Sequence, residues 1–146
     1  MEIKTLLEQR GLLIFDGAMG TQLQAKGLKT GETPELLNLT AKDLLKEIHR
    51  SYIDAGADII SANTFGANSY KLSHSGKSVD EIITAGIINC KEAIKESGKD
   101  VFCALDIGPI GQLLEPTGSL KFEEAYDIFR EEIVAGYKAG ADAVLF

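Results

Sequence analysis

The chain has 146 residues, enough for one ordinary domain. Its content of 45% hydrophobic and 25% charged residues excludes a disordered or fibrous protein. Acidic residues outnumber basic ones by 22 to 15, and the net charge of −7 argues against a protein that binds nucleic acid or an anionic membrane surface.

Four short apolar segments recur at roughly even intervals, at residues 12–16, 58–63, 101–106 and 142–146. Each is apolar on both faces, which is typical of strands that are buried on both sides of a parallel sheet. Helical patterns separate the segments. The order of elements therefore predicts an α/β fold of about four parallel strands alternating with helices.

The first helices carry recognisable start and stop residues. A capping box at Thr5 and a glycine at Gly11 bound a helix that precedes the first strand. A short helix is expected after that strand and should run through Lys26. The next helix is expected to start at Thr40 and to end at Gly56.

Two longer helices follow. Ser78 begins a capping box, and Gly98 ends the helix that it starts. Ser119 is the expected N-cap of the last helix, which ends at Gly140. The apolar stripe of this last helix is expected to face inward and consists of Phe122, Tyr126, Phe129 and Ile133.

The sequence Ala-Gly-Ala-Asp occurs twice, at residues 55–58 and 139–142, each time between a helix and a strand. Glycine accepts the left-handed cap conformation there, and the small alanines let helix and sheet approach closely. The repetition indicates a regular βα unit. It favours a barrel or a regular α/β layer over an α+β arrangement.

Functional sites of parallel α/β folds lie beyond the carboxyl ends of the strands. Asp16 follows the first apolar segment directly. Its carboxylate suits an ammonium group, and the backbone amides of Gly17 and Ala18 suit a carboxylate, so the three together fit the head group of an α-amino acid. Asp16 fits equally well as the N-cap of the short helix, followed by a tight glycine turn.

The next two strand ends also carry polar residues. Asn63 and Thr64 offer neutral hydrogen-bonding groups and Phe65 an apolar wall for a ligand. The alternative is a polar turn with an aromatic side chain packed inward. Asp106, after the third strand, either orients a ligand or caps its loop, which is rich in glycine and proline.

The residue types that most often bind metals are few. Cys90 falls in a helix stripe and Cys103 within a strand, so both are expected in the core. His49, among charged residues of a helix, and His74, in a polar loop, are expected to have no catalytic role. No signal peptide or membrane-spanning run is recognised in the sequence, so a cytoplasmic location is expected.

Several motifs occur in the order and spacing found in one enzyme family. They are FDGAMGT at residues 15–21, ANTF at 62–65 and DIGP at 106–109, with PELLNLT at 34–40 between them. On these motifs the chain resembles the homocysteine S-methyltransferase family over essentially its whole length. It most resembles the cobalamin-dependent branch of that family.

The resemblance implies that residues 1–146 are the N-terminal half of a (β/α)₈ TIM barrel, truncated after the fourth strand. The barrel belongs to an enzyme that methylates the thiol of homocysteine to form methionine. Asp16 would bind the ammonium group of homocysteine, and the amides of Gly17 and Ala18 its carboxylate. The implied substrate-binding residues are Asp16, Gly17, Ala18, Met19, Thr21, Asn63, Thr64, Phe65 and Asp106.

The resemblance also implies cofactors. A zinc ion held by three cysteines lowers the pKa of the homocysteine thiol, and methylcobalamin and methyltetrahydrofolate, bound by other domains, supply the methyl group. Cys90 and Cys103 do not match the ligand positions, so the zinc ligands are expected downstream. A second ammonium partner, a glutamate, is expected directly after Phe146. We therefore expect a piece of a longer polypeptide that is inactive alone, with the rest of its barrel and its cobalamin and folate domains as partners.

Three other interpretations remain. The methyl donor would be betaine or S-methylmethionine in a related homocysteine methyltransferase. A different (β/α)₈ protein could also have a first strand that ends in Asp-Gly. The third is a non-catalytic half-barrel that binds an amino acid or acts in assembly. Coding sequence beyond Phe146 distinguishes an enzyme fragment from a non-catalytic half-barrel, and absence of the zinc cysteines from it would favour a different (β/α)₈ protein.

Overall fold

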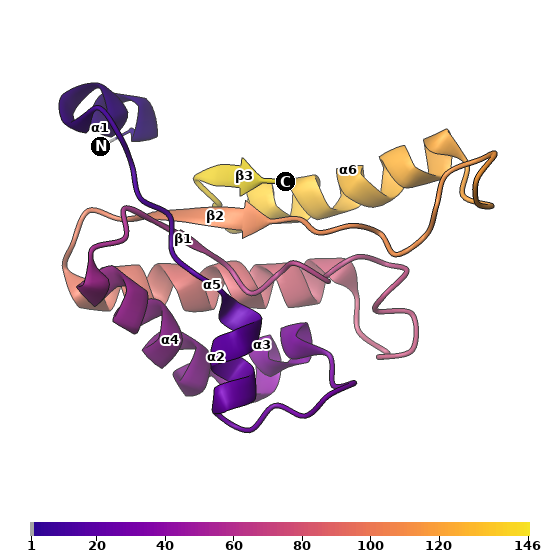
Figure 1. The fold of residues 1–146 in the computed structure, drawn as a ribbon, viewed down its shortest axis with the longest axis horizontal. Helices are drawn as coiled ribbons and strands as arrows, with labels where there is room; N and C mark the ends of the chain where they lie inside the picture. The colour runs from indigo at the N-terminus through magenta and orange to yellow at the C-terminus, as the bar shows by residue number, and fades with distance from the viewer. Residues whose placement is uncertain (1) are drawn as a thin grey trace.

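The computed structural model describes residues 2–146, which form a parallel sheet of strand order β1-β2-β3 packed against helices (Figure 1). In chain order the elements are α1 (Ile3–Arg10), α2 (Met19–Ala25), the 3₁₀ turn η1 (Pro34–Leu36), α3 (Leu37–Thr40), α4 (Lys42–Ala55), β1 (Ile59–Ser61), α5 (Val79–Ser97), β2 (Phe102–Asp106), α6 (Phe122–Ala139) and β3 (Ala143–Leu145). The predicted α/β class with parallel strands is confirmed.

The sheet separates two apolar layers. On one face α4, α5 and α6 lie side by side, and Ile60 of β1, Leu105 of β2 and Ile87 of α5 belong to the main core there. On the opposite face Leu6 of α1 packs against Ile59. Figure 1 shows α1 on the other side of the sheet from α5. Strands β1 and β2 are therefore covered on both faces, as their apolar sequences predicted.

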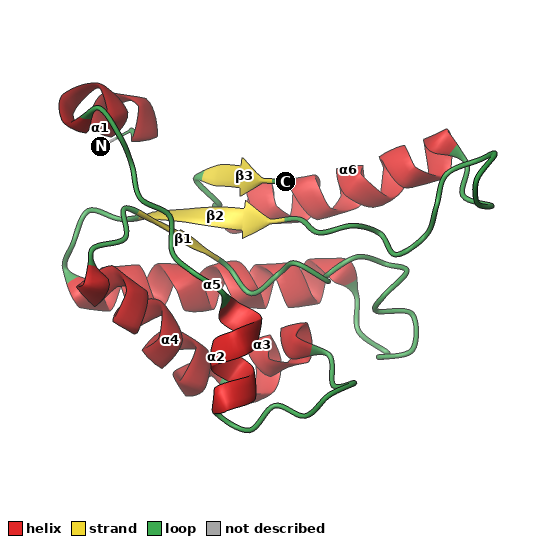
Figure 2. Ribbon diagram, viewed as in Figure 1, coloured by secondary structure: helices red, strands yellow, loops and turns green. Residues whose placement is uncertain are grey.

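The segment at residues 12–16 is extended, but its only bridge joins Phe15 to Ile59, and Figure 2 draws the segment as a loop. A hydrogen bond of 3.0 Å from Asp16 N to Ile59 O holds it beside β1. The prediction of a strand buried on both sides is wrong here, because Leu12 is 62% and Ile14 54% exposed. Among the described residues the segment has only one neighbouring strand, so its outer side is open.

The two Ala-Gly-Ala-Asp sequences have the same structural role. Asp58 Oδ2 accepts a hydrogen bond of 2.9 Å from Ile14 N, and Asp142 Oδ2 accepts one of 2.8 Å from Cys103 N. Each aspartate thus fastens the start of its strand to the backbone of the preceding one. Each also pairs with a basic side chain of a helix or its end: Asp58 with Arg10, and Asp142 with Lys91. The repeat marks the amino-terminal edge of the sheet.

The predicted C-terminal ends of the helices are confirmed. The C-cap of each of four helices is a glycine in the left-handed conformation: Gly11, Gly56, Gly98 and Gly140. The Ser78 side chain accepts a hydrogen bond of 3.1 Å from Glu81 N, as a capping box requires. The short helix expected after the first apolar segment is α2, which ends at Ala25, one residue before the expected Lys26.

Two predicted helix starts are wrong. Thr5 lies inside α1, whose first turn closes with a hydrogen bond of 3.1 Å from Leu6 N to Glu2 O. Thr40 ends α3 instead of starting α4, because its Oγ1 donates back to Leu36 O at 3.3 Å. A threonine followed three residues later by an acidic residue therefore did not mark a helix start in either case.

The start of α6 is also later than predicted. Leu120 forms a bridge with Leu114 across a small loop, which keeps the backbone near Ser119 out of a helical conformation. The helix begins at Phe122, and Lys121 is its N-cap.

The apolar stripe of α6 does not face inward along its whole length, contrary to the prediction. Phe122 is 69% and Tyr126 61% exposed, whereas Phe129 and Ile133 are partly buried. Together with Leu114, Ala125, Arg130 and Val134 these side chains line an apolar groove of about 440 Å³. The face of α6 turned to the sheet carries Gly136 instead, where a Cβ would lie 2.6 Å from a methyl group of Leu105.

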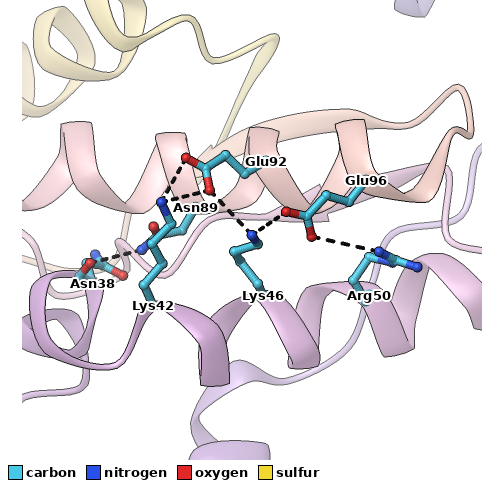
Figure 3. A network of polar contacts seen from close by, with 7 residues as sticks. All are labelled: Asn38, Lys42, Lys46, Arg50, Asn89, Glu92 and Glu96. Atoms are coloured by element: carbon cyan, nitrogen blue, oxygen red, sulfur yellow. Dashed lines mark hydrogen bonds and ion pairs between the residues drawn. The ribbon is translucent and has the colours of Figure 1, made fainter.

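A ladder of ion pairs joins α4 to α5 (Figure 3). Lys42 and Lys46 both pair with Glu92, at 2.8 and 3.4 Å, and Glu96 pairs with Lys46 and, at 3.9 Å, with Arg50. The hydrogen bond from Lys42 is the main cause that lowers the pKa of Glu92. Such solvent-screened pairs contribute little to stability. Their regular spacing fixes the register of the two helices.

The two cysteines are buried and unpaired, as predicted. Burial raises the pKa of the Cys90 thiol, which keeps it protonated. Among residues 2–146 no helix is both long and apolar enough to cross a membrane.

Candidate functional site

Asp106, at the carboxyl end of β2, lies within electrostatic reach of two other carboxyl groups, those of Asp16 and Glu35. The pKa of Asp106, the last residue of β2, is raised to about 6 by burial first and then by the negative charges of Asp16 and Glu35. Because like charges oppose one another's ionisation, this edge of the sheet favours the arrival of a cation. The convergence of Asp16 and Asp106 agrees with their predicted position at strand ends.

Asp16 fastens the first segment to β1. Its Oδ2 accepts a hydrogen bond of 2.9 Å from Ser61 N, and its Oδ1 accepts one of 3.0 Å from the Ser61 hydroxyl. Burial raises the pKa of Asp16, although the Ser61 hydrogen bonds oppose the shift. The alternative role as a helix cap is not seen, since the N-cap of α2 is Ala18 and has no side-chain hydrogen bond. Each carboxylate oxygen keeps a further lone pair for a ligand.

The turn between this aspartate and α2 packs tightly against α4. A Cβ on Gly17 would lie 3.0 Å from the ring of Tyr52, so any larger residue would have to push this ring aside by a few tenths of an ångström. The Tyr52 hydroxyl donates a hydrogen bond of 2.9 Å to Ala18 O. Gly17 and Ala18 are exposed, and their amides donate no backbone hydrogen bond within residues 2–146. These two amides are therefore available to an acceptor from outside.

Asn63 is buried, and its amide nitrogen is used inside the protein. It donates to Pro34 O at 2.9 Å and to Asn38 Oδ1 at 3.1 Å, while the Asn38 amide donates to Asn63 O at 2.8 Å. Asn89 of α5 donates in turn to Asn38 O at 3.0 Å (Figure 3). This buried network attaches the end of β1 to η1, α3 and α5.

Thr64 is also buried and joins two strand ends. Its hydroxyl donates to Asp106 O at 2.8 Å and accepts from Asp106 N at 3.1 Å. Phe65, by contrast, is 52% exposed, and Lys71 Nζ lies 5.5 Å from its ring centroid. Phe65 O accepts a hydrogen bond of 3.0 Å from Gly108 N. The aromatic side chain therefore faces solvent at this edge and is not packed inward.

Met19 and Thr21 of α2 are less directly connected to the carboxyl groups. Met19 is partly buried and packs against a small cluster of buried residues that includes Leu23 and Leu45, between α2 and α4. Thr21 is exposed.

Glu35 is the polar residue of this edge that sequence reasoning missed as a site residue. It is only 5% exposed, and its Oε1 accepts a hydrogen bond of 2.6 Å from Gly66 N. With Phe65, Gly66 and Lys71 it lines a cavity of about 420 Å³. No local pattern could have found it, because its partner is 31 residues away along the chain.

The described residues contain no group of three or more histidine, cysteine or acidic side chains arranged to hold a metal ion. His74 is exposed. His49 is fully buried, and neither of its ring nitrogens has a hydrogen-bond partner among residues 2–146. Burial lowers its pKa to about 4. His49 is therefore neutral at physiological pH and lies inside the fold.

Comparison with known proteins identifies the family of the chain. Residues 13–146 match the family model for homocysteine S-methyltransferases. The chain is 31% identical to the methionine synthase of Mycobacterium tuberculosis over 99% of its own length, and 31% identical to that of Mycobacterium leprae over 95%. It spans only 13% and 12% of those two relatives.

Solved structures show the same fold. The metallated form of the homocysteine methyltransferase MmuM from Escherichia coli superposes with a TM-score of 0.85 at 21% identity, over 97% of this chain and 55% of that one. The oxidised form of MmuM gives 0.84 over the same shares. The chain thus spans about half of these structures and has the fold of the N-terminal half of a (β/α)₈ barrel. It belongs to the homocysteine S-methyltransferase family.

Proposed function

We propose that this chain supplies the homocysteine-binding half of a methyltransferase site, at which the homocysteine thiol is methylated to form methionine. Membership of the family supports the reaction class. The observation that carries the substrate assignment is the half-buried Asp16 carboxylate, which Ser61 holds within electrostatic reach of Asp106. A buried negative edge of this kind favours the ammonium group of an amino acid.

In this proposal Asp16 binds the substrate ammonium group, and the exposed amides of Gly17 and Ala18 bind its carboxylate. Phe65 forms an apolar wall, and Asp106 adds negative charge. Asn63 and Thr64 border the pocket while their side chains hold the strand ends together. Met19 and Thr21, in the first turn of α2, complete the proposed rim.

The residues of this chain do not fit a zinc site. Cys90 and Cys103 are buried in the core, and residues 2–146 offer no third ligand nearby. We propose that zinc is held by cysteines outside this sequence, and that methylcobalamin and methyltetrahydrofolate are bound by other domains. Betaine or S-methylmethionine as methyl donor is the alternative. Two buried unpaired cysteines are typical of a reducing compartment, and we propose the cytoplasm.

Binding to the 146-residue chain tests the proposal. Homocysteine is expected to bind more tightly than 4-sulfanylbutanoate, which lacks only the amino group, in isothermal titration calorimetry. Incubation with homocysteine and methylcobalamin is expected to yield no methionine, because the metal-binding half is absent. Equal affinity for the two thiols would contradict the substrate assignment. Formation of methionine would contradict the proposal that the chain is inactive alone.

The substitution Tyr52→Phe tests the carboxylate half of this site. It removes the hydrogen bond to Ala18 O and leaves the ring that packs against Gly17. Because the hydrogen bond that holds this turn contributes about 0.5–1.5 kcal/mol, homocysteine affinity should fall about 2- to 12-fold. Affinity for 3-aminopropane-1-thiol, which lacks the carboxylate, should not change. Equal losses for both ligands in calorimetry would mean that Tyr52 supports the fold and not the carboxylate site.

A further inference from the structure

Glu35 is a buried carboxylate whose charge has no partner in the described part of the chain. It is only 5% exposed, yet none of the ion pairs of residues 2–146 includes it. Glutamate is almost never buried to this degree without a partner. A cation that pairs with this carboxylate would therefore come from outside the described residues.

The position of this carboxylate is fixed. Oε1 accepts a hydrogen bond of 2.6 Å from Gly66 N, and a Cβ on Gly66 would lie 2.7 Å from the same oxygen. The second oxygen, Oε2, accepts no hydrogen bond from residues 2–146. Glu35 thus presents an unpartnered oxygen from a side chain that the fold holds in place.

The surroundings of Glu35 identify the kind of cation. It lines the cavity of about 420 Å³ that Phe65 and Lys71 also border, directly beside the strand ends. Its negative charge helps to raise the pKa of Asp106, in addition to the larger effect of Asp16. An organic ammonium group fits this place better than a metal ion, because residues 2–146 form no cluster of three metal-ligating side chains.

We propose that Glu35 is a specificity-determining residue of the amino-acid site, whose buried charge selects a ligand that carries an ammonium group. This inference rests on the proposed function. It assigns to Glu35 a share of the ammonium recognition, beside Asp16 and the glutamate that the resemblance implies after Phe146. The Gly66 hydrogen bond keeps the carboxylate from turning away from the cavity.

The test compares Glu35→Gln with the wild type, using homocysteine and 4-sulfanylbutanoate in calorimetry. Glutamine keeps the shape and an acceptor for Gly66 N but removes the charge. Homocysteine affinity should fall about 10-fold, whereas 4-sulfanylbutanoate affinity should stay the same or rise. Glu47→Gln, which removes one charge from an exposed side chain of α4, is the matched control and should change neither affinity.

Each outcome decides something. Equal losses for both ligands in Glu35→Gln, or no loss for either, would overturn the inference, since in both cases the charge of Glu35 does not select for the ammonium group. A wild type that binds both thiols equally would contradict the proposed function itself. If Glu35→Gln does not fold, Gly66→Ala serves instead, because its methyl group must displace the carboxylate while the charge remains in the protein. That variant should also lose the preference for homocysteine, and an unchanged preference would overturn the inference.

Discussion

Replacing Asp16 by asparagine is expected to weaken homocysteine binding about 100-fold. The loss of one partner of a desolvated charge pair costs about 2–5 kcal/mol, and each 1.4 kcal/mol is tenfold in affinity. Asparagine also replaces one acceptor oxygen by a donor, so it cannot accept from both the amide and the hydroxyl of Ser61 as the carboxylate does. Calorimetry with homocysteine and with 4-sulfanylbutanoate measures the effect, which should be confined to homocysteine.

Asp58→Asn is the matched control for this substitution. Asp58 fastens the same two segments at the opposite edge of the sheet, where its Oδ2 accepts from Ile14 N at 2.9 Å. Its replacement should lower the free energy of unfolding and leave the relative affinities of the two thiols unchanged. If both asparagine variants lose homocysteine affinity equally, Asp16 acts only by fastening the first segment to β1.

The features that could be predicted from the sequence depend on short stretches of chain. Glycine caps such as Gly56 and Gly140 follow from backbone conformation alone, and the carboxyl ends of parallel strands must share one edge. The sequence therefore correctly predicted that Asp16 and Asp106 lie at the same edge of the sheet. The roles of Asn63 and Thr64 were left open, because the sequence does not reveal that their partners lie on η1, α3 and β2.

The features that could not be predicted depend on contacts between distant residues. Glu35 reaches Gly66 across 31 positions, and nothing in its immediate neighbourhood marks it. The stripe of α6 was assigned inward because apolar spacing indicates a face but does not say what that face packs against. The small side of the helix, at Gly136, faces the sheet because Leu105 fills the space there.

Replacing Glu132 by glutamine is expected to stabilise the protein at alkaline pH. Glu132 of α6 is fully buried, and neither carboxylate oxygen has a hydrogen-bond partner in the described residues. Burial raises its pKa from 4.5 to about 7, although the charge of Lys71 opposes the shift. The folded state therefore binds this proton more tightly than the unfolded state. The stability that this group contributes is complete below pH 4.5 and is lost as the pH rises through 7.

The size of this effect follows from the shift. A change from 4.5 to about 7 corresponds to about 3 kcal/mol of the free energy of unfolding, lost once the pH exceeds 7. Glutamine has the same shape and does not titrate. Glu132→Gln should therefore match the wild type near pH 4 and exceed its stability by about 2–3 kcal/mol at pH 8, measured by urea unfolding.

His49 makes the comparison of whole pH profiles more informative than a single measurement. Its pKa is lowered by burial from 6.5 to about 4, so the unfolded state binds the proton first and stability falls as the pH drops from 6.5 toward 4. In the wild type this slope opposes that of Glu132 between pH 4.5 and 6.5, and the two largely cancel. In Glu132→Gln the pH dependence that His49 causes should become visible, so that stability rises with pH across this range.

Asp16 and Asp106 titrate in both proteins, so their contributions cancel in the difference between the two pH profiles. A difference between variant and wild type that does not change with pH would show that Glu132 is not held neutral by its burial.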